Sequence, residues 1–454
     1  MRIIIVGDGK VGYTLSENLS REGHDITIID NRNDVLQRSM ESLDVFTIKG
    51  NGTSASVLKQ AGVAKADLLI AATSMDEVNI LCCLMGRKLG AERTIARIRN
   101  PEYREQLTMF EKEMGLSMAV NPEFASAKEI ARLVSFPSAM SVGTFADDRV
   151  FMAEFRIDKD NPLAGKPVSS LHDMHMDILI GVVDRQHEAF IPNGDFVLNP
   201  GDHIHIVGDY ASIGNYLKAT GQREKKVRSV MIVGGGLIAH YLSTMLIDLG
   251  IAVKIIEKEQ DRCEYLSEIL PAAMIISGDG TSKELLDSEG LTDYSAFIAL
   301  TDMDEENLII SLYAAYKGVP KVITKINRLG YADVISNAGI NRVISPKNIA
   351  ANQIIRYVRN MENTNGNRIK TLYRVVGNSA EVVEFSASAS TKNLGVPFSK
   401  LPIKNDVLIA TIVRNNEIII PKGKDYIVEG DSVIVVTTIE HLNDLNDIFI
   451  YRGL

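Results

Sequence analysis

Three glycines near the N-terminus have a spacing that is typical of phosphate binding. Gly7, Gly9 and Gly12 form the pattern G-x-G-x-x-G directly after the apolar run Arg2–Val6. The first glycine of such a pattern allows a tight turn, the second lets a pyrophosphate approach the backbone, and the third lets a helix pack closely on a strand. The N–H groups at the start of that helix attract anions. The pattern therefore predicts phosphate binding by main-chain groups.

An acidic residue follows the glycines at the distance expected for ribose recognition. Residues 26–29 form a second apolar strand pattern, and Asp30 ends it. A carboxylate at this position can accept hydrogen bonds from the ribose hydroxyls of a dinucleotide. The glycine pattern alone is weak evidence, but its place between a strand and a helix, followed by this acid, is specific. The alternatives are a glycine turn without a ligand and a simple turn role for Asp30.

The elements that position these residues occur twice in the chain. Residues 11–21 are expected to form an amphipathic helix after the first strand. Gly234, Gly235 and Gly236, followed by Ala239 in the place of the third glycine, repeat the opening loop, and Glu257 stands at the same offset from them as Asp30 from Gly7. The fingerprint allows alanine at its third position. The chain is therefore an internal duplication.

Two further signatures recur at nearly the same offset. Residues 50–54 correspond to 278–282, and both 73–79 and 301–307 read T-x-M-D-E-x-N after a buried strand. Strands alternate with helices throughout each copy. This alternation predicts two parallel, doubly wound α/β domains of the Rossmann type.

A smaller α+β module follows each of these domains. Gly201-Asp202 corresponds to Gly430-Asp431, and residues 191–194 correspond to 420–423, within short β patterns. We expect four domains, at residues 1–136, 141–220, 227–358 and 370–454. Linkers are expected at 137–143, 221–226 and 361–367.

Composition restricts the function further. The chain has 454 residues and a net charge of −9, which argues against a general nucleic-acid binder because such a protein needs a basic surface. No apolar run is long enough to span a bilayer, and the N-terminus reads as a strand instead of a signal peptide, so a cytoplasmic protein is expected. Cys82, Cys83 and Cys263 match neither a disulfide framework nor a zinc motif and are expected to be buried thiols.

The doubled order of nucleotide fold and small lobe resembles a known family. It is similar to the cytoplasmic regulators of Trk-type potassium uptake systems, TrkA-like proteins built from two tandem RCK (KTN) units. The resemblance is carried by residues 7–12, Asp30, 50–53, 73–79 and 95–99, with their counterparts in the second half.

The resemblance implies a regulatory subunit that is not an enzyme. It implies binding of NAD(H), with ATP or ADP in related sites, and a ring of four chains and eight units below an integral-membrane potassium channel or transporter subunit (TrkH-like). The protein would then lie peripherally on the inner face of the plasma membrane. Helices at residues 123–133 and 349–358 would be the joints through which a nucleotide changes the ring.

The resemblance also implies the binding residues. In the first fold they are Gly7, Asp8, Gly9, Lys10, Val11, Gly12, Asp30, Asn51, Gly52, Thr73, Ser74 and Arg97. In the second fold they are Gly234, Gly235, Gly236, Leu237, Ile238, Glu257, Asp279, Gly280, Thr301, Asp302 and Lys325. The second fold departs from the family pattern, because Lys325 and Asn327 stand where the first fold has Arg97 and Arg99. A lysine cannot make the bidentate fork of an arginine.

Structural roles compete with functional ones at several of these positions. Ser74 with Glu77, Asp302 with Glu305, and Thr281 with Glu284 have the spacing of helix capping boxes, which we favour over a catalytic acid cluster. Arg97 and Arg99 share one face of a strand, where a solvated edge is the alternative. His172 with His175 and His203 with His205 could each be half of a metal site, but exposed histidines without metal are expected.

Two other functions stay open at this point. An NAD-dependent dehydrogenase would need an acid or base beside the nicotinamide, and none of the eight histidines recurs in the other repeat. A cyclic dinucleotide could instead bind between the small lobes, as in some RCK proteins. Its contacts would come from Ile180, Ile191, Pro192, Ile409 and Pro421. Lobe core and dimer contact are the preferred reading of these apolar residues.

Overall fold

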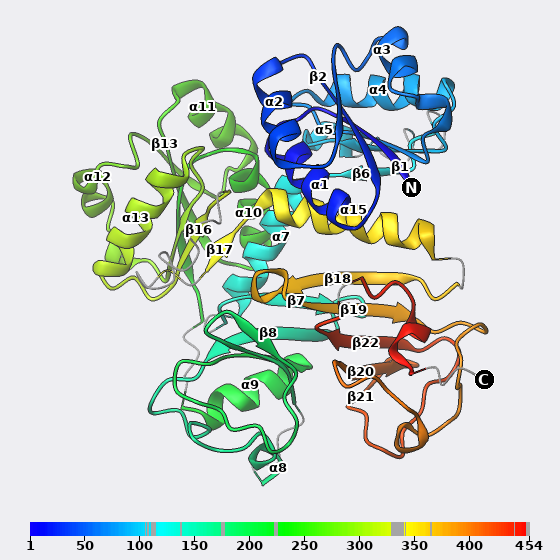
Figure 1. The fold of residues 1–454 in the computed structure, drawn as a ribbon. Helices are drawn as coiled ribbons and strands as arrows, with labels where there is room; N and C mark the ends of the chain where they lie inside the picture. The colour runs from blue at the N-terminus through cyan, green and yellow to red at the C-terminus, as the bar shows by residue number, and fades with distance from the viewer. Residues whose placement is uncertain are drawn as a thin grey trace. The chain divides into compact units, whose positions relative to one another are not determined.

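The computed structural model describes residues 1–104, 106, 109, 115–136, 139–173, 178–221, 226–327, 340, 342–363, 366–439 and 441–450. The chain divides into two compact units. The first unit joins Met1–Ala131 to Val227–Ile355, and the second joins Arg132–Lys226 to Arg356–Leu454. The two nucleotide folds are thus packed together, and so are the two small lobes. Figure 1 shows each pair as segments that are far apart in the colour sequence.

The first nucleotide fold is a six-stranded parallel sheet with helices on both faces (Figure 1). Its strand order is β3-β2-β1-β4-β5-β6, so the order reverses between β1 and β4. Ligands of such sheets bind at this switch point, beyond the carboxyl ends of the strands. The strands are β1 (Arg2–Val6), β2 (Asp25–Asp30), β3 (Phe46–Lys49), β4 (Leu68–Ala71), β5 (Arg93–Arg97) and β6 (Met118–Val120). The helices are α1 (Lys10–Arg21), α2 (Asn33–Ser42), α3 (Ala55–Gln60), α4 (Asp76–Lys88), α5 (Pro101–Arg104) and α7 (Pro122–Ser135).

The second nucleotide fold repeats this topology. Its sheet has the order β14-β13-β12-β15-β16-β17, and its pairs are again parallel. The strands are β12 (Ser229–Val233), β13 (Ala252–Glu257), β14 (Met274–Ser277), β15 (Ala296–Ala299), β16 (Val322–Lys325) and β17 (Val343–Ile344). The helices are α10 (Leu237–Asp248), α11 (Gln260–Ile269), α12 (Lys283–Ser288), α13 (Asp304–Tyr316) and α15 (Pro346–Glu362). The prediction of two Rossmann-like domains is confirmed.

The second unit contains two antiparallel five-stranded sheets. Their orders are β10-β9-β11-β8-β7 and β18-β19-β22-β20-β21. Side chains of both sheets, including Val182 and Val436, form one buried cluster. The strands are β7 (Val142–Phe145), β8 (Val150–Arg156), β9 (Leu179–Arg185), β10 (Glu188–Phe190), β11 (His203–Gly208), β18 (Ile369–Val375), β19 (Ala380–Ser386), β20 (Val407–Arg414), β21 (Glu417–Ile419) and β22 (Ser432–Thr437), with the helices α8 (Ser170–Asp173) and α9 (Tyr210–Ala219).

The repeated Gly-Asp turn of the small lobes has a structural cause. Asp202 accepts two hydrogen bonds from the Arg185 guanidinium at 2.8 Å each, and Asp431 accepts the same pair from Arg414 at 2.9 Å. These forked pairs join the turn to the neighbouring strand in each lobe. The duplication of the lobe is therefore visible in its contacts as well as in its sequence.

Several sequence expectations need correction. Gly143, which was expected in a linker, lies in β7, and Met361 still belongs to α15. His205 is buried at 3 % exposure instead of exposed, because β11 packs between two strands of its sheet and against the other lobe. His175 and the side chain of His172 lie outside the described residues. The three cysteines are free and buried, as expected.

Within the ranges given above, no helix is both long enough and apolar enough to cross a membrane.

Candidate functional site

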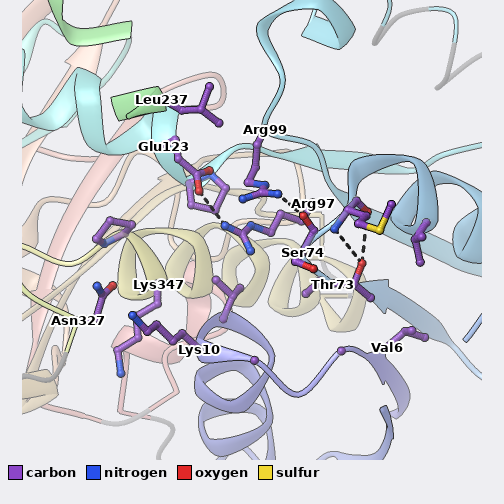
Figure 2. Close-up of a pocket in the computed structure, with 18 of the residues that line it drawn as sticks. Val6, Lys10, Thr73, Ser74, Arg97, Arg99, Glu123, Leu237, Asn327 and Lys347 are labelled. Carbon is purple, nitrogen blue, oxygen red and sulfur yellow. Dashed lines mark hydrogen bonds and ion pairs between the residues drawn. The ribbon is translucent and has the colours of Figure 1, made fainter. Parts of the chain in front are cut away.

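A cavity of about 1020 Å³ opens at the carboxyl ends of the parallel strands in the first unit. Both nucleotide folds line it, and Figure 2 shows side chains of both pointing toward it. Fifteen predicted residues line it: Gly7, Gly9, Lys10, Val11, Asp30, Asn51, Gly52, Thr73, Ser74 and Arg97 from the first fold, and Gly236, Leu237, Ile238, Asp302 and Lys325 from the second. The other predicted residues, Asp8, Gly12, Gly234, Gly235, Glu257, Asp279, Gly280 and Thr301, are not among its lining residues.

The glycine loop of the first fold has the geometry that its three glycines predict. Gly7 has a φ of +97°, which a residue with a side chain rarely adopts. A Cβ atom on Gly12 would lie 1.8 Å from the Gly7 carbonyl oxygen, so only glycine lets α1 pack there. A Cβ atom on Gly9 would meet no atom within 4 Å, since this residue faces the open cavity. The loop thus combines a fixed turn with an exposed backbone.

Asp30 lines the cavity and also holds the glycine loop. Its Oδ2 accepts the backbone N–H of Asp8 at 2.7 Å, and its Oδ1 accepts that of Arg32 at 2.9 Å. An ionised carboxylate has about four lone-pair positions, so two stay available for ribose hydroxyls. The strand-end turn role and the ribose-binding role of Asp30 are therefore compatible.

In the recurring T-x-M-D-E-x-N segment, the asparagine joins two strand ends by hydrogen bonds. The segment does not form the expected capping box. Asn79 is buried; its Oδ1 accepts the Thr73 N–H at 2.8 Å, and its Nδ2 donates to the Arg97 carbonyl at 2.9 Å. Asn307 repeats both bonds, to Thr301 and Lys325. The expected caps are wrong because α4 and α13 begin one residue later, after Met75 and Met303, which make no side-chain cap.

The third expected cap is shifted by one residue. Ser282 instead of Thr281 caps α12, and it accepts the Leu285 N–H. The hydroxyl of Thr281 donates to Asp279 in a local turn at 2.7 Å. A Cβ on Gly280 would lie 2.3 Å from a Val233 methyl group, so this loop packs on the first strand of its fold.

The first fold also places an arginine–glutamate pair at the cavity. The Arg97 Nη2 donates to Glu123 at 2.7 Å, and both side chains are mostly buried (Figure 2). The Arg97 Nε and the second Glu123 oxygen are buried without a hydrogen-bond partner in the described structure. Arg97 is therefore not part of a solvated strand edge. Arg99 lies beyond the end of β5, where its backbone N–H donates to Asp76 at 2.8 Å.

Three lysines from both folds meet at the same cavity. Lys10 comes from α1, Lys325 from the end of β16 and Lys347 from the first turn of α15 (Lys10 and Lys347 in Figure 2). Burial lowers the pKa of Lys325, and the charge of Lys10 lowers it further; burial also lowers the pKa of Lys347. Among the described residues, Lys325 makes long contacts, at 3.4 Å to the Leu300 carbonyl and 3.5 Å to Asp302. A bound anion would favour the charged form of all three.

Sequence reasoning missed Glu123 and Lys347, although both line the cavity. The available signal is a repeated dipeptide, because Pro122-Glu123 and Pro346-Lys347 each begin the helix after the last strand of their fold. The two copies carry opposite charges, so the two sides of the cavity differ chemically.

The second fold has an acid at the corresponding position, but its glycine loop is packed against a helix. Glu257 accepts the Gly235 N–H at 2.6 Å, as Asp30 accepts that of Asp8. The Arg262 Nε donates to the Gly235 carbonyl at 2.7 Å, and a Cβ on Gly235 would lie 2.6 Å from a Leu266 methyl group. Helix α11 thus packs against Gly235 of this glycine loop, and Glu257 is not among the residues that line the cavity.

The titratable side chains that line the cavity, among the described residues, are lysines, arginines and carboxylates, with no histidine, tyrosine or cysteine. Within the described part of the chain, no group of three or more histidine, cysteine, aspartate or glutamate residues could hold a metal ion. The arrangement is suited to binding an anionic nucleotide, with carboxylate contact to its ribose.

Comparison with known proteins agrees with this geometry. The TrkA-N domain family matches residues 3–122 and 230–346, and the TrkA-C domain family matches residues 152–219 and 382–450. The Trk system potassium uptake protein TrkA of Haemophilus influenzae is 32 % identical and covers 96 % of the chain and 95 % of its own length. The TrkA homolog of Archaeoglobus fulgidus is 33 % identical and covers 99 % and 100 %.

Solved structures show the same fold. The GsuK RCK domain has a TM-score of 0.64 at 19 % identity and covers 97 % of this chain and 92 % of its own. A GsuK channel bound to NAD has a TM-score of 0.63 at 19 % identity, with coverages of 97 % and 77 %. The sequence relatives are named as potassium uptake proteins and not as enzymes. The chain therefore belongs to the TrkA family, with two tandem pairs of TrkA-N and TrkA-C domains.

Proposed function

We propose that the protein is a nucleotide-sensing regulatory subunit of a potassium uptake system, and that NAD(H) binds in its first nucleotide fold. The observation that carries this proposal is that Gly7, Gly9 and Asp30 of that fold line one cavity of about 1020 Å³, with the Gly9 backbone exposed to it. Membership in the TrkA family supports the link to potassium uptake.

NAD(H) is favoured over NADP(H) as the ligand. The Asp30 carboxylate can accept the free ribose hydroxyls of NAD(H), but it repels the 2′-phosphate of NADP(H). A structural neighbour is described as bound to NAD and another as bound to ADP. We propose ATP or ADP as further ligands, because Lys325 and Lys347 add positive charge where terminal phosphates of such a nucleotide would be stabilised.

The second fold is proposed to contribute to this ligand through its cavity-lining residues and not through a second equal site. Leu237 stands where Lys10 stands, and α11 packs against Gly235 of the second glycine loop through Arg262 and Leu266. We therefore expect one tight dinucleotide site per chain. Glu257, Asp279, Gly280 and Thr301, which do not line the cavity, are not part of this proposed site.

The proposed partner is an integral-membrane potassium channel or transporter subunit (TrkH-like) at the inner face of the plasma membrane, bound by a ring of four chains. One face of α13 supports assembly, because Ile309 and Tyr316 are 65 % and 86 % exposed and lie seven residues apart on one side of the helix. An exposed apolar helix face is available for a contact between chains. A closed ring is the physical default for a repeated heterologous contact, since an open one would polymerise.

The helix α15 is the proposed path of the signal. Lys347 lies in its first turn at the cavity. Near its other end, the fully buried Arg359 makes a forked ion pair with Glu381 at 2.8 Å in the second unit. A phosphate that attracts Lys347 therefore acts on a helix whose end is anchored in a small lobe. We propose that the nucleotide changes the angle at α7 and α15 and leaves the fold of each lobe intact.

Titration calorimetry of the full chain with NADH, NADPH, NAD⁺ and ATP tests the ligand proposal. We expect about one NADH per chain, and NADPH binding that is weaker by an order of magnitude or more. Equal affinity for NADH and NADPH, or two equal NADH sites per chain, would contradict it. Mass photometry in the same buffer tests the four-chain ring, which monomers or dimers at working concentration would exclude.

A further inference from the structure

A second carboxylate, that of Asp8, lies directly beside Asp30. Asp8 occupies the first variable position of the glycine loop, and only 4 % of its surface is exposed. Its backbone N–H donates to Asp30, and its side-chain Oδ2 accepts the Ser39 hydroxyl at 2.7 Å. Its Oδ1 is buried and has no hydrogen-bond partner among the described residues. A buried, half-satisfied carboxylate is costly when it is charged.

The groups that face Asp8 come from two neighbouring segments. Asp30, at the end of β2, opposes its negative charge, while Arg32 just after that strand and Arg38 in α2 favour the charge. Ser39 in α2 donates a hydrogen bond to the Asp8 side chain, which also favours the charge. Burial is the largest influence and, together with the charge of Asp30, raises the pKa of Asp8 to about 6 despite the two arginines. In the second fold Gly235 stands at this position, so that fold lacks the group altogether.

We propose that Asp8 binds a proton when a dinucleotide binds, so that the first fold takes up the nucleotide and a proton together. The inference rests on the proposed function, namely that a dinucleotide occupies this site. The proton comes from solvent and binds to the Asp8 carboxyl group. The Asp8 Oδ1 accepts no hydrogen bond from a described residue, so its protonation breaks no hydrogen bond.

The direction of the coupling follows from charge. A bound pyrophosphate brings negative charge to the loop that carries Asp8, and the ligand removes water from the cavity beside it. Both effects disfavour the aspartate anion, so the pKa of Asp8 rises further on binding. By linkage, a ligand that raises this pKa must bind more tightly to the protonated protein. Affinity is therefore highest below pH 6 and falls as the pH rises through the pKa values of the free and the bound protein.

The size of the effect can be measured as a proton count. If binding raises the pKa by about one unit, about half a proton is taken up per nucleotide at pH 6.5, and the affinity falls about tenfold between pH 5 and pH 8. The regulator would then respond to acidification of the cytoplasm as well as to the nucleotide. Such a response depends on the residue at position 8 and would be absent from a fold with glycine there.

Calorimetry of the full chain with NAD⁺ at pH 6.5 tests the proposal, because the pyrophosphate of NAD⁺ does not titrate near this pH. The same titration in two buffers of different ionisation enthalpy gives the number of protons taken up. We expect uptake by the wild type, no uptake by Asp8→Asn or Asp8→Gly, and unchanged uptake by Asp34→Asn, which removes an exposed carboxylate from α2. The Asp8→Gly variant copies the residue that the second fold has at this position.

The outcomes distinguish failure of the proton-uptake inference from failure of the proposed nucleotide site. Binding of NAD⁺ without proton uptake by the wild type overturns the inference and leaves the nucleotide site in place. Uptake that persists in both Asp8 variants assigns the proton to another group and also overturns it. If NAD⁺ does not bind at any pH, the proposed function itself fails. Affinity of the Asp8 variants that no longer changes between pH 5.5 and pH 8 supports the inference in a second, independent measurement.

Discussion

Replacement of Asp30 by asparagine tests which of the two nucleotide folds binds NADH. The change removes the charge from a carboxylate that accepts the Asp8 and Arg32 N–H groups at 2.7 and 2.9 Å and lines the cavity. A hydrogen bond to a charged group contributes about 1.5–3 kcal/mol, which corresponds to about 10- to 150-fold in the dissociation constant. We expect Asp30→Asn to weaken NADH binding by that factor and to reduce the preference over NADPH.

The chain contains a matched control for this variant. Glu257 accepts the Gly235 and Glu259 N–H groups at 2.6 and 2.9 Å, as Asp30 does in the first fold, but it does not line the cavity. We expect Glu257→Gln to leave NADH affinity within about twofold. Calorimetry measures both variants, and thermal unfolding checks that each is folded. Wild-type affinity in Asp30→Asn, or an equal loss in both variants, would refute the assignment of the site to the first fold.

Four further outcomes follow from the geometry. Gly9→Ala should weaken NADH binding without loss of stability. Gly12→Ala should lower the unfolding free energy by about 1–3 kcal/mol or more, because its Cβ meets a carbonyl oxygen. Equal melting temperatures of the two variants would contradict this. Lys347→Gln should weaken ATP binding about tenfold by calorimetry, and unchanged affinity would remove Lys347 from the site. His203→Gln should lower the melting temperature more at pH 6 than at pH 9. The hydrogen bond to Glu154 raises the pKa of His203. The stabilisation from this pair is therefore complete below the pKa of His203 in the unfolded state, and it is lost as the pH rises through the pKa of His203 in the folded state. Purified protein should not oxidise NADH with small carbonyl substrates, and sustained turnover in an absorbance assay would favour the dehydrogenase alternative.

The architecture was predictable because its signals are local and repeated. A strand, a glycine loop and a terminal acid are close in the sequence, so Gly7, Gly12 and Asp30 could be placed without knowledge of the tertiary fold. The duplication supplied a second, independent occurrence of each motif. The same locality explains why Ser74 and Asp302 were wrongly expected to cap helices: their spacing suggested capping boxes, but Asn79 and Asn307 each bond to a strand end eighteen residues away.

The composition of the cavity was not predictable from one repeat at a time. Lys325 and Lys347 meet Lys10 only because the two nucleotide folds pack in one unit. Closure of the second glycine loop depends on Arg262 and Leu266 in α11, whose contact with Gly235 is a matter of packing and has no sequence signature. Burial of His205 likewise depends on packing against the partner lobe.

Potassium flux tests the central claim most directly. Vesicles that contain the membrane transport subunit and the wild-type chain should show a potassium flux that changes when NADH is added and does not change with the same concentration of NADPH. The Asp30→Asn chain should bind the membrane subunit but should require about 10- to 150-fold more NADH for the same change. A wild-type flux that is identical with and without nucleotide would contradict regulation by this site.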